Sequence, residues 1–553
     1  MRKNLVLFIV VICTIFLCNY IVMPKIDYDK IESNSYSKYV THSFETSEES
    51  SSESEKSKVI IAQLVLDYED YGSIKDRFQT YSDDDYRDKR KDHRKKAKAY
   101  HEGNNSNVFK TIKTEKYQEI YVSKYSPYID ITYDYSYFGT HKNEILSELT
   151  NNKHVKEVRL IESEVYECHM STVIDLIDAG AACNNRTTTG EGVVVGILEP
   201  SIINTNDDYL EHLDITIRSS GYNVIAPRDH ATNIARVIGG TYGLAPGVSI
   251  LNSYLTGTVN EEMEWMIENN VDIVNMSCGE EENEGYYSTV SAYVDYIAYT
   301  YDIIMVASAG NTHDLVTNPG LGYNVITCAA SSYYGDICPA SAFQVVEGPI
   351  KPTISAPASV VSTDGVPGGE TGETSAAAAI VSGTIALLLE DYPSLASDKA
   401  RLIALIVTNA YDANNYEYEE ENGFDDDTGG GLINYQRIID HYNTAFNYTN
   451  SSGQANTIFK SRMIYLSEGD NLRAAFASIA KADGTVDGTV FTDYDMYLKD
   501  PNGNVVVEVL EAATNVMMLN YIAPSTGYYR VEIRQYSALR DTIDYTGFAY
   551  SVY

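Results

Sequence analysis

The sequence predicts a multi-domain protein built around an α/β domain, in which helices cover both faces of a parallel sheet. Three observations support this prediction. The 553 residues are too many for a single core. Residues 170–443 alternate continuous apolar runs with helical patterns, which is typical of a parallel sheet buried on both faces. The stretches on either side differ, since the first mixes strand and helix patterns and the last contains strand patterns alone.

The first 24 residues predict an export signal or a membrane anchor. Arg2 and Lys3 form a positive region, and an apolar region follows over residues 5–17. No small-x-small cleavage site follows, and the apolar stretch over 4–23 is just long enough to span a bilayer. We therefore expect a protein that is either secreted or held at the cell surface. Residues 25–58 are rich in Ser and Glu and predict a disordered linker.

Residues 59–165 predict a small α+β unit. The run VIIAQLVL is a strand pattern, and a charge-dense helical pattern follows it up to Gly103. Two further strand patterns come next, YQEIYVSKY and IDITYDYSYF, and then the segment EILSELTNNKHVKEVRLIES, which combines a helix, a turn and a strand. The order strand–helix–strand–strand–helix–strand is that of a ferredoxin-like fold.

Residues 166–445 form the predicted α/β domain, and residues 455–553 form a predicted β-sandwich. In the α/β domain the strand runs are GVVVGIL, SILNSYL, VDIVNMS and DIIMVASAG, and helices are expected at 232–239, 261–270, 286–300 and 375–391. In the last region, the segment TDYDMYLKDPNGNVVVEV has a strand–turn–strand pattern with turn residues at its centre. Further alternating patterns up to residue 553 indicate the sandwich.

The charge and the cysteines limit the possible partners. A net charge of −37 repels phosphate backbones, so nucleic acid is not an expected partner. Outside the apolar N-terminal segment there are five cysteines, and their spacing matches no zinc-binding pattern. Cys328 and Cys338 could bridge a loop, or they could be two small buried hydrophobic residues.

Four segments of the α/β domain together fit acyl transfer by a serine. Ser375, in GETSAAAAIVSG, stands where a loop enters a helix, so that its backbone N–H and the helix dipole favour developing negative charge. His230 opens another helix in RDHATNIARVIGG, and Glu199 closes the buried strand GVVVGILE. Asn311 follows the apolar strand IIMVASAG. Nucleophile, base, orienting acid and oxyanion donor are the groups this chemistry needs.

These segments resemble the sequence blocks of the subtilisin family of serine peptidases. The histidine block with GLAPGVSI after it, the strand IVNMSCG, the segment VASAGN and the serine block all have counterparts there, in the order acid, His, Ser. The resemblance implies a subtilisin-like fold for the α/β domain. It also implies that residues 59–165 are an inhibitory propeptide and that the last region is a sandwich like those of secreted bacterial peptidases.

The resemblance further implies a role for each residue. Ser375 would attack the scissile carbonyl, His230 would take its proton, and Glu199 would hold the histidine in the right tautomer. Asn311 and the Ser375 N–H would stabilise the oxyanion. Ser277, Cys278 and Gly279 would form the edge along which a peptide substrate pairs. No redox or nucleotide cofactor is required, and calcium would be compatible with the acidity, although no ligand set can be named.

The sequence also departs from the family pattern near these residues. Glu199 replaces the expected aspartate, which moves the carboxylate by about one bond length, and a misplacement of about 1 Å can cost about 10²-fold in rate. Asp207, Asp208, Asp214 and Asp229 are other nearby carboxylates. Glu373 replaces a glycine two residues before the serine. The alternative to an active self-processing endopeptidase is therefore a catalytically weakened pseudoprotease with a binding or regulatory role.

Overall fold

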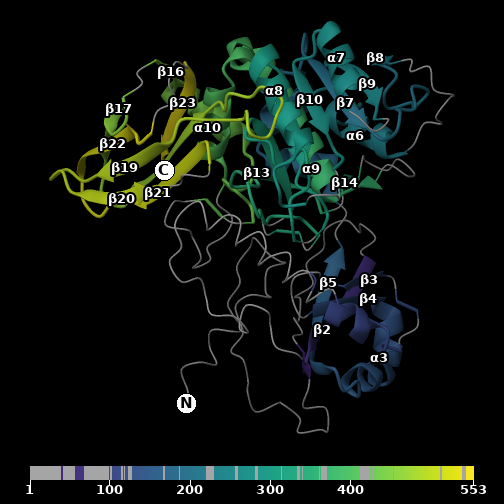
Figure 1. Ribbon diagram of the computed structural model, residues 1–553. Coiled ribbons are helices and arrows are strands. Elements are labelled where there is room, and N and C mark those ends of the chain that lie inside the picture. Colours follow the sequence, from purple (N-terminus) through teal and green to yellow (C-terminus); the bar gives the residue numbers. More distant parts are fainter. Residues whose placement is uncertain are drawn as a thin grey trace. The chain divides into compact units, whose positions relative to one another are not determined.

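The chain falls into two compact units, Met1–Glu167 and Cys168–Tyr553, in a computed structural model (Figure 1). The structure describes residues 39–41, 57–67, 99, 103–113, 116–117, 119–122, 128–165, 168–185, 187–218, 229–255, 259–279, 284–312, 314–332, 337–338, 340–359, 361–362, 370–411, 424–425, 427–451, 454–510, 514–537 and 543–553. The predicted export segment and most of the Ser/Glu-rich linker lie outside these residues.

The described residues of the first unit form a five-stranded sheet, in the order β1-β5-β2-β4-β3. Its strands are β1 (Tyr39–Thr41), β2 (Ser57–Leu66), β3 (Glu119–Val122), β4 (Tyr128–Asp134) and β5 (Val155–Val165), and its helix α3 spans Tyr135–Thr150. Residues 103–109 are also helical. The elements from β2 to β5 therefore follow the predicted strand–helix–strand–strand–helix–strand order. Leu64, Ile129, Ile131, Tyr133 and Leu146 form part of the core of this unit.

The α/β part of the second unit is built on a seven-stranded parallel sheet, in the order β13-β12-β11-β10-β7-β9-β8 (Figure 1). Its strands are β7 (Val194–Glu199), β8 (Asp214–Ile217), β9 (Ser249–Tyr254), β10 (Ile273–Met276), β11 (Ile304–Ser308), β12 (Val325–Ser331) and β13 (Ile354–Pro357). Every neighbouring pair is parallel. A small second sheet joins β6 (Cys168–His169), β14 (Val361–Ser362) and β15 (Glu370–Thr371).

Helices cover both faces of the large sheet, so the predicted architecture of a parallel sheet buried on both faces is confirmed. α6 (Asp229–Gly239) and α9 (Glu373–Asp391) pack on one face, and α7 (Asn260–Glu268) and α8 (Thr289–Tyr301) pack on the other. The other helices in the described part of this unit are α4 (Met170–Leu176), α5 (Gly180–Asn185), α10 (Lys399–Asn409), α11 (Tyr435–Asp440), η2 (Pro393–Ser397) and η3 (Tyr442–Thr444).

α9 is the central helix of this part of the molecule. It is long and apolar enough to cross a membrane by composition, but 89% of its apolar window is buried inside the fold. The small side chains of its alanine run let the helix pack close to the sheet. Gly383 allows Leu244 to approach the helix backbone, because a Cβ on Gly383 would lie 2.9 Å from the Leu244 Cβ. α9 is therefore the core helix of a globular domain.

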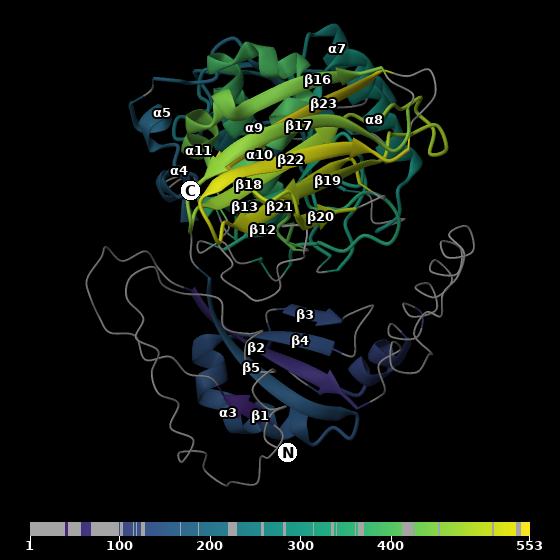
Figure 2. The same ribbon diagram turned by 90° about the vertical axis from the view of Figure 1, so that its left-hand side faces the viewer.

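The C-terminal region consists of two antiparallel sheets that pack as a β module, as predicted (Figure 2). One sheet has the order β16-β23-β18-β21 and the other β17-β22-β19-β20. The strands are β16 (Ala445–Asn450), β17 (Thr457–Leu466), β18 (Asn471–Ser478), β19 (Tyr494–Lys499), β20 (Val505–Val509), β21 (Val516–Ile522), β22 (Gly527–Gln535) and β23 (Asp544–Val552). β18 and β23 contact α10.

The described cysteines of the second unit, Cys183, Cys278, Cys328 and Cys338, carry thiols. Cys328 is 0% exposed and Cys338 is 5% exposed, and both belong to the main apolar cluster. The structure therefore agrees with the second of the two sequence-based alternatives, in which both residues act as small buried hydrophobic side chains.

Candidate active site

Glu199 is the last residue of β7, at the carboxyl end of a central strand of the sheet. Residues alternate between the two faces along a strand, so Val195, Ile197 and Glu199 point to the face that α6 and α9 cover. The Glu199 side chain is fully buried. The carboxyl edge of a parallel sheet is where α/β proteins build their sites, and β7 places a carboxylate there.

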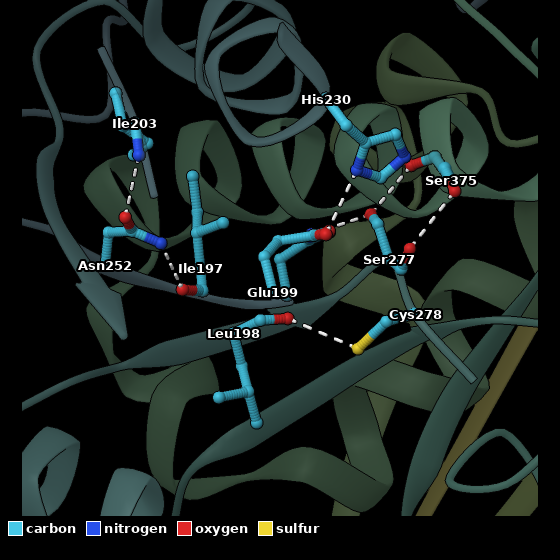
Figure 3. Close-up of polar contacts among 10 residues, drawn as sticks. Ile197, Leu198, Glu199, Ile203, His230, Asn252, Ser277, Cys278 and Ser375 are labelled. Atoms are coloured by element: carbon cyan, nitrogen blue, oxygen red, sulfur yellow. Dashed lines mark hydrogen bonds and ion pairs between the residues drawn. The ribbon is translucent and has the colours of Figure 1, made fainter. Parts of the chain in front are cut away.

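His230 is the second residue of α6, and its Nδ1 lies 3.0 Å from Oε2 of Glu199 (Figure 3). This is an ordinary hydrogen-bond length, so the fold accommodates the extra methylene of a glutamate. Donation from Nδ1–H leaves Nε2 as the proton acceptor. The histidine side chain is 44% exposed, so the ring is held by a buried acid while remaining accessible from the surface.

The environment shifts the pKa values of both partners upwards. Burial raises the pKa of the Glu199 carboxyl, against the lowering effect of the hydrogen bond from His230. The hydrogen bond to Glu199 raises the pKa of His230, and this effect exceeds the opposing effect of burial. The second carboxylate oxygen, Oε1, is buried and has no hydrogen-bond partner among the described residues. The contact with the buried Glu199 thus makes His230 a stronger base.

Ser375 is the third residue of α9, whose N-cap is Gly372. The N–H groups of a first helical turn have no acceptor within the helix, and the dipole adds positive potential there. Ser375 Oγ donates to the Ser277 carbonyl at 3.1 Å, and Ser277 Oγ donates to the Ser375 carbonyl at 2.9 Å (Figure 3). No hydrogen bond joins the described side chains of Ser375 and His230. Catalytic hydrogen bonds are often formed only when substrate is bound.

Asn311 lies three residues after β11 and is fixed by the residue that precedes the candidate nucleophile. Its Oδ1 accepts hydrogen bonds from the Thr374 backbone N–H at 3.2 Å and from the Thr374 hydroxyl at 2.6 Å. Thr374 Oγ1 also accepts a hydrogen bond from the Gly310 N–H at 3.2 Å. Because these contacts occupy Oδ1, the amide nitrogen of Asn311 remains as a donor at an exposed position beside the start of α9.

The three residues expected to bind substrate, Ser277, Cys278 and Gly279, directly follow β10 and differ in exposure. Gly279 is exposed, Cys278 is half-buried and Ser277 is buried. The Cys278 thiol lies 3.5 Å from the Leu198 carbonyl, and burial raises its pKa well above the usual range. The backbone edge is therefore open at Cys278 and Gly279, while Ser277 contacts Ser375 directly.

Sequence reasoning missed three polar residues that hold this arrangement together: Thr374, Asn275 and Ser382. Ser382 Oγ, in α9, donates to Asn275 Oδ1 at 3.0 Å, and Asn275 Nδ2 donates to Ser277 Oγ at 2.9 Å. Asn275 and Ser382 are 0% exposed, and their bonds tie the end of β10 to α9. A sequence signal was present, because Asn275 interrupts the apolar run of its strand and a buried amide must find partners.

Three of the four other carboxylates considered from the sequence have described side chains, and none of the three takes the place of Glu199 beside His230. Asp207 is buried and pairs with Arg236 of α6, with Nε at 3.1 Å from Oδ1, while Asp208 and Asp214 are exposed. The side chain of Asp229 lies outside the described residues. Within the described part of the chain, no three His, Cys, Asp or Glu side chains gather as a metal site.

Comparison with known proteins identifies the α/β domain. Residues 190–431 match the model of the subtilase family, Peptidase_S8. Subtilisin DY of Bacillus licheniformis is 26% identical over 268 residues, which cover 45% of this chain and 90% of that protein. Subtilisin NAT of Bacillus subtilis subsp. natto is 28% identical over 282 residues, which cover 46% of this chain and 68% of that protein. Fervidolysin of Fervidobacterium pennivorans is 26% identical over 295 residues, which cover 44% of this chain and 40% of that protein.

Solved structures also match this chain, over 45% and 66% of its length in the two cases that follow. The structure of the patellamide maturation protease PatA is 20% identical, with a TM-score of 0.39, and the match covers 45% of this chain and 96% of that chain. A serine protease of Aeromonas sobria is 13% identical, with a TM-score of 0.37, and the match covers 66% of this chain and 88% of that chain. On the matches to the family model and to the subtilisins, residues 190–431 are similar to the subtilase family, and we call this part of the chain the subtilase domain.

Proposed function

We propose that this protein is an exported serine endopeptidase that is made as a self-processing precursor and hydrolyses peptide bonds through an acyl-enzyme. The observation that supports the proposal most strongly is the 3.0 Å hydrogen bond between the buried Glu199 and His230, in the same site as a serine in the first turn of α9. A buried acid, an oriented histidine and a serine at a helix N-terminus are the groups that serine acyl transfer requires.

In the proposed reaction, Ser375 Oγ leaves the Ser277 carbonyl and attacks the scissile carbonyl carbon while its proton passes to His230 Nε2. The carbonyl oxygen becomes an oxyanion that accepts hydrogen bonds from the Ser375 N–H and from Asn311 Nδ2. His230 then gives the proton to the leaving amine, the C–N bond breaks and an acyl-serine remains. Water attacks this ester with His230 as base, and the acid product and free Ser375 are released.

The proposed precursor has residues 59–165 as a propeptide, which would block the active site until a cut near residues 163–172. The junction between the two compact units, after Glu167, falls within this window. Export would follow from the N-terminal segment, as a cleaved signal or as an anchor through residues 4–23. The proposed partners are a protein or peptide substrate and the protein's own propeptide.

Intact mass tests the chemistry directly. The wild-type protein, Ser375→Ala and a control, Ser397→Ala, are expressed in parallel; Ser397 is a serine of η2, remote in sequence from the site residues. We expect wild type and Ser397→Ala to be shortened to a start near 163–172, and Ser375→Ala to stay full length. If all three stay full length and none reacts with a serine-directed fluorophosphonate, the chain is instead a pseudoprotease of subtilase fold.

A further inference from the structure

Two glycines border the place where a substrate side chain must lie. Gly279 ends the segment along which a peptide would pair, and Gly310 immediately precedes Asn311, the proposed oxyanion donor. Ser277 lies against Ser375 and is hydrogen-bonded to it in both directions (Figure 3). If the scissile carbonyl of a peptide sat at Ser375, with its oxygen at Asn311 and its backbone along residues 277–279, the side chain of its acyl residue (the residue whose carbonyl is attacked) would lie between these two segments. The size of the gap between Gly279 and Gly310 therefore limits that side chain.

The side chain of Thr317 occupies this gap. A Cβ on Gly279 would lie 2.2 Å from Thr317 Oγ1 and 2.8 Å from its Cβ, and a Cβ on Gly310 would lie 2.7 Å from Thr317 Cγ2 and 2.9 Å from Oγ1. Distances below 3.0 Å are essentially never seen for real Cβ atoms, so the threonine touches both backbones. Thr317 is 4% exposed. One threonine side chain thus fills the space between the two segments.

Hydrogen bonds hold Thr317 in this position. Its N–H donates to the Ala309 carbonyl at 2.9 Å, and its hydroxyl donates to the same carbonyl at 3.3 Å. The next residue, Asn318, is fully buried and is itself fixed, because its Oδ1 accepts from the Ser291 hydroxyl at 2.6 Å and its Nδ2 donates to the Tyr286 carbonyl at 3.1 Å. Thr317 therefore cannot move aside without breaking buried hydrogen bonds.

The region behind the threonine is also filled. Ala309, Val316, Leu321 and Ala342 form a buried apolar cluster at this point of the fold. Protein interiors of this kind are packed to the density of organic crystals, so a large side chain cannot enter by small adjustments. Among the residues that the structure describes at this point, Thr317 and the apolar cluster are packed together.

We propose that Thr317 closes the pocket for the acyl residue and restricts cleavage to bonds that follow a small residue, namely Gly, Ala or Ser. This inference rests on the proposed peptidase function and adds the class of substrate. Forcing a larger side chain into a filled site costs roughly a factor of ten to a hundred in an equilibrium or rate. A peptide with Leu or Phe at this position is thus expected to be cut at least about tenfold more slowly.

The test compares kcat/KM for quenched peptides of one sequence that differ only in the acyl residue, which is Gly, Ala, Leu or Phe. Wild type is assayed beside Thr317→Gly, which empties the gap, and beside Thr317→Val, which keeps the volume but removes the hydroxyl. We expect wild type and Thr317→Val to prefer Gly and Ala, and Thr317→Gly to improve on Leu and Phe by about tenfold or more. Fluorophosphonate labelling measures the fraction of each variant that has a reactive serine, so that kcat/KM can be compared per active molecule.

The outcomes separate this inference from the proposed function. If wild type labels and cuts Leu and Phe peptides as fast as Ala peptides, the inference is wrong while the peptidase function stands. If wild type neither labels nor cuts any peptide, the peptidase function itself fails. Should Thr317→Gly not fold, Thr317→Ser takes its place, since it removes only the methyl group near Gly310; an unchanged Ala-to-Leu ratio in that variant, with labelling intact, also overturns the inference.

Discussion

The fully buried Glu199 is hydrogen-bonded to His230, and this hydrogen bond raises the pKa of the proposed base. A neutral imidazole is needed to accept the serine proton, so activity is lost as the pH falls through the pKa of His230. Because the hydrogen bond to Glu199 raises that pKa, the loss should begin at a higher pH than for an ordinary histidine, whose pKa is about 6.5. The glutamate therefore affects both the orientation of the base and the pH range of activity.

We predict that Glu199→Gln lowers kcat by about 10³–10⁴-fold and shifts the acid limb of the pH profile of kcat/KM to lower pH. The neutral amide no longer favours the imidazolium, while the burial that lowers the pKa of His230 remains. Glu199→Asp is the matched control, because it keeps the charge but shortens the side chain. It should lose less activity than Glu199→Gln and keep the acid limb near its wild-type position. An acid limb that stays in place in Glu199→Gln would show that Glu199 does not set the pKa of His230.

At the scale of elements, the start of α9 carries a conformational cost. Glu373, the first residue of the helix, has a φ of +58°, in the left-handed region that only glycine adopts without penalty. The sequence comparison with the family had marked this position as a replaced glycine, and the backbone gives the physical reason why glycine suits it. The residue lies two positions before Ser375, so the strained backbone leads directly into the proposed oxyanion site.

Replacing Glu373 by Gly should stabilise the protein by about 1 kcal/mol, since the left-handed conformation costs an L-residue about that much. The measurement is thermal unfolding in a Ser375→Ala background, which excludes self-digestion. Glu373→Ala is the matched control: it removes the same side chain but keeps the penalty, so it should give no gain. Equal unfolding midpoints for the Gly and Ala variants would refute the conformational explanation.

The elements themselves were predictable to within a few residues, but their side-chain contacts were not. The helix expected at 375–391 is observed as Glu373–Asp391, and the one expected at 286–300 as Thr289–Tyr301, because apolar periodicity is a local signal. Thr317 lies in a loop without any periodic pattern, and its importance arises from contacts with Gly279, 38 residues away in the sequence, and with Gly310. Contacts between residues so far apart in the sequence produce no pattern in the local sequence from which they could be predicted.

At the scale of the whole molecule, the C-terminal strands share an apolar core with the subtilase domain. Ala475, Ala477, Val516, Met518 and Ala549 belong to the same buried cluster as the alanines of α9 and the leucines of α10. The strand patterns of the last region predicted a sandwich, but they included neither β18 nor β21, and they could not show which surface the buried face of the sheet would meet. A sheet that buries one face against a helix of another region depends on that region for its stability.

Specific polar contacts cross the same junction. The buried Arg473 of β18 donates to the Thr408 carbonyl near the end of α10 at 3.2 Å and to the Gly430 carbonyl at 2.7 Å. Asn324 donates to the Ala480 carbonyl at 2.9 Å and accepts from the Ala480 N–H at 2.8 Å. A cation near a helix C-terminus is favourable, and buried carbonyls left without a donor are costly. The junction therefore combines apolar burial with satisfied polar groups.

We predict from this junction that the subtilase domain and the β module unfold together, in one cooperative transition. Val306→Ala in β11 and Phe476→Leu in β18, each in a buried position, should each lower the free energy of unfolding of the full-length Ser375→Ala protein by about 1–3 kcal/mol, and with it the midpoint of that transition. Arg473→Leu should also lower the free energy of unfolding, by about 1–3 kcal/mol, since the buried Gly430 carbonyl loses the Arg473 donor and the Thr408 carbonyl keeps only the 3.4 Å bond from Ser551 Oγ. Calorimetry distinguishes the alternatives, because independent domains would give two transitions of which Val306→Ala shifts one and Phe476→Leu the other. A shared shift would mean that the β module is part of the folding unit that holds His230 and Ser375 in place, so that losing it would cost activity even though none of its residues belongs to the proposed site.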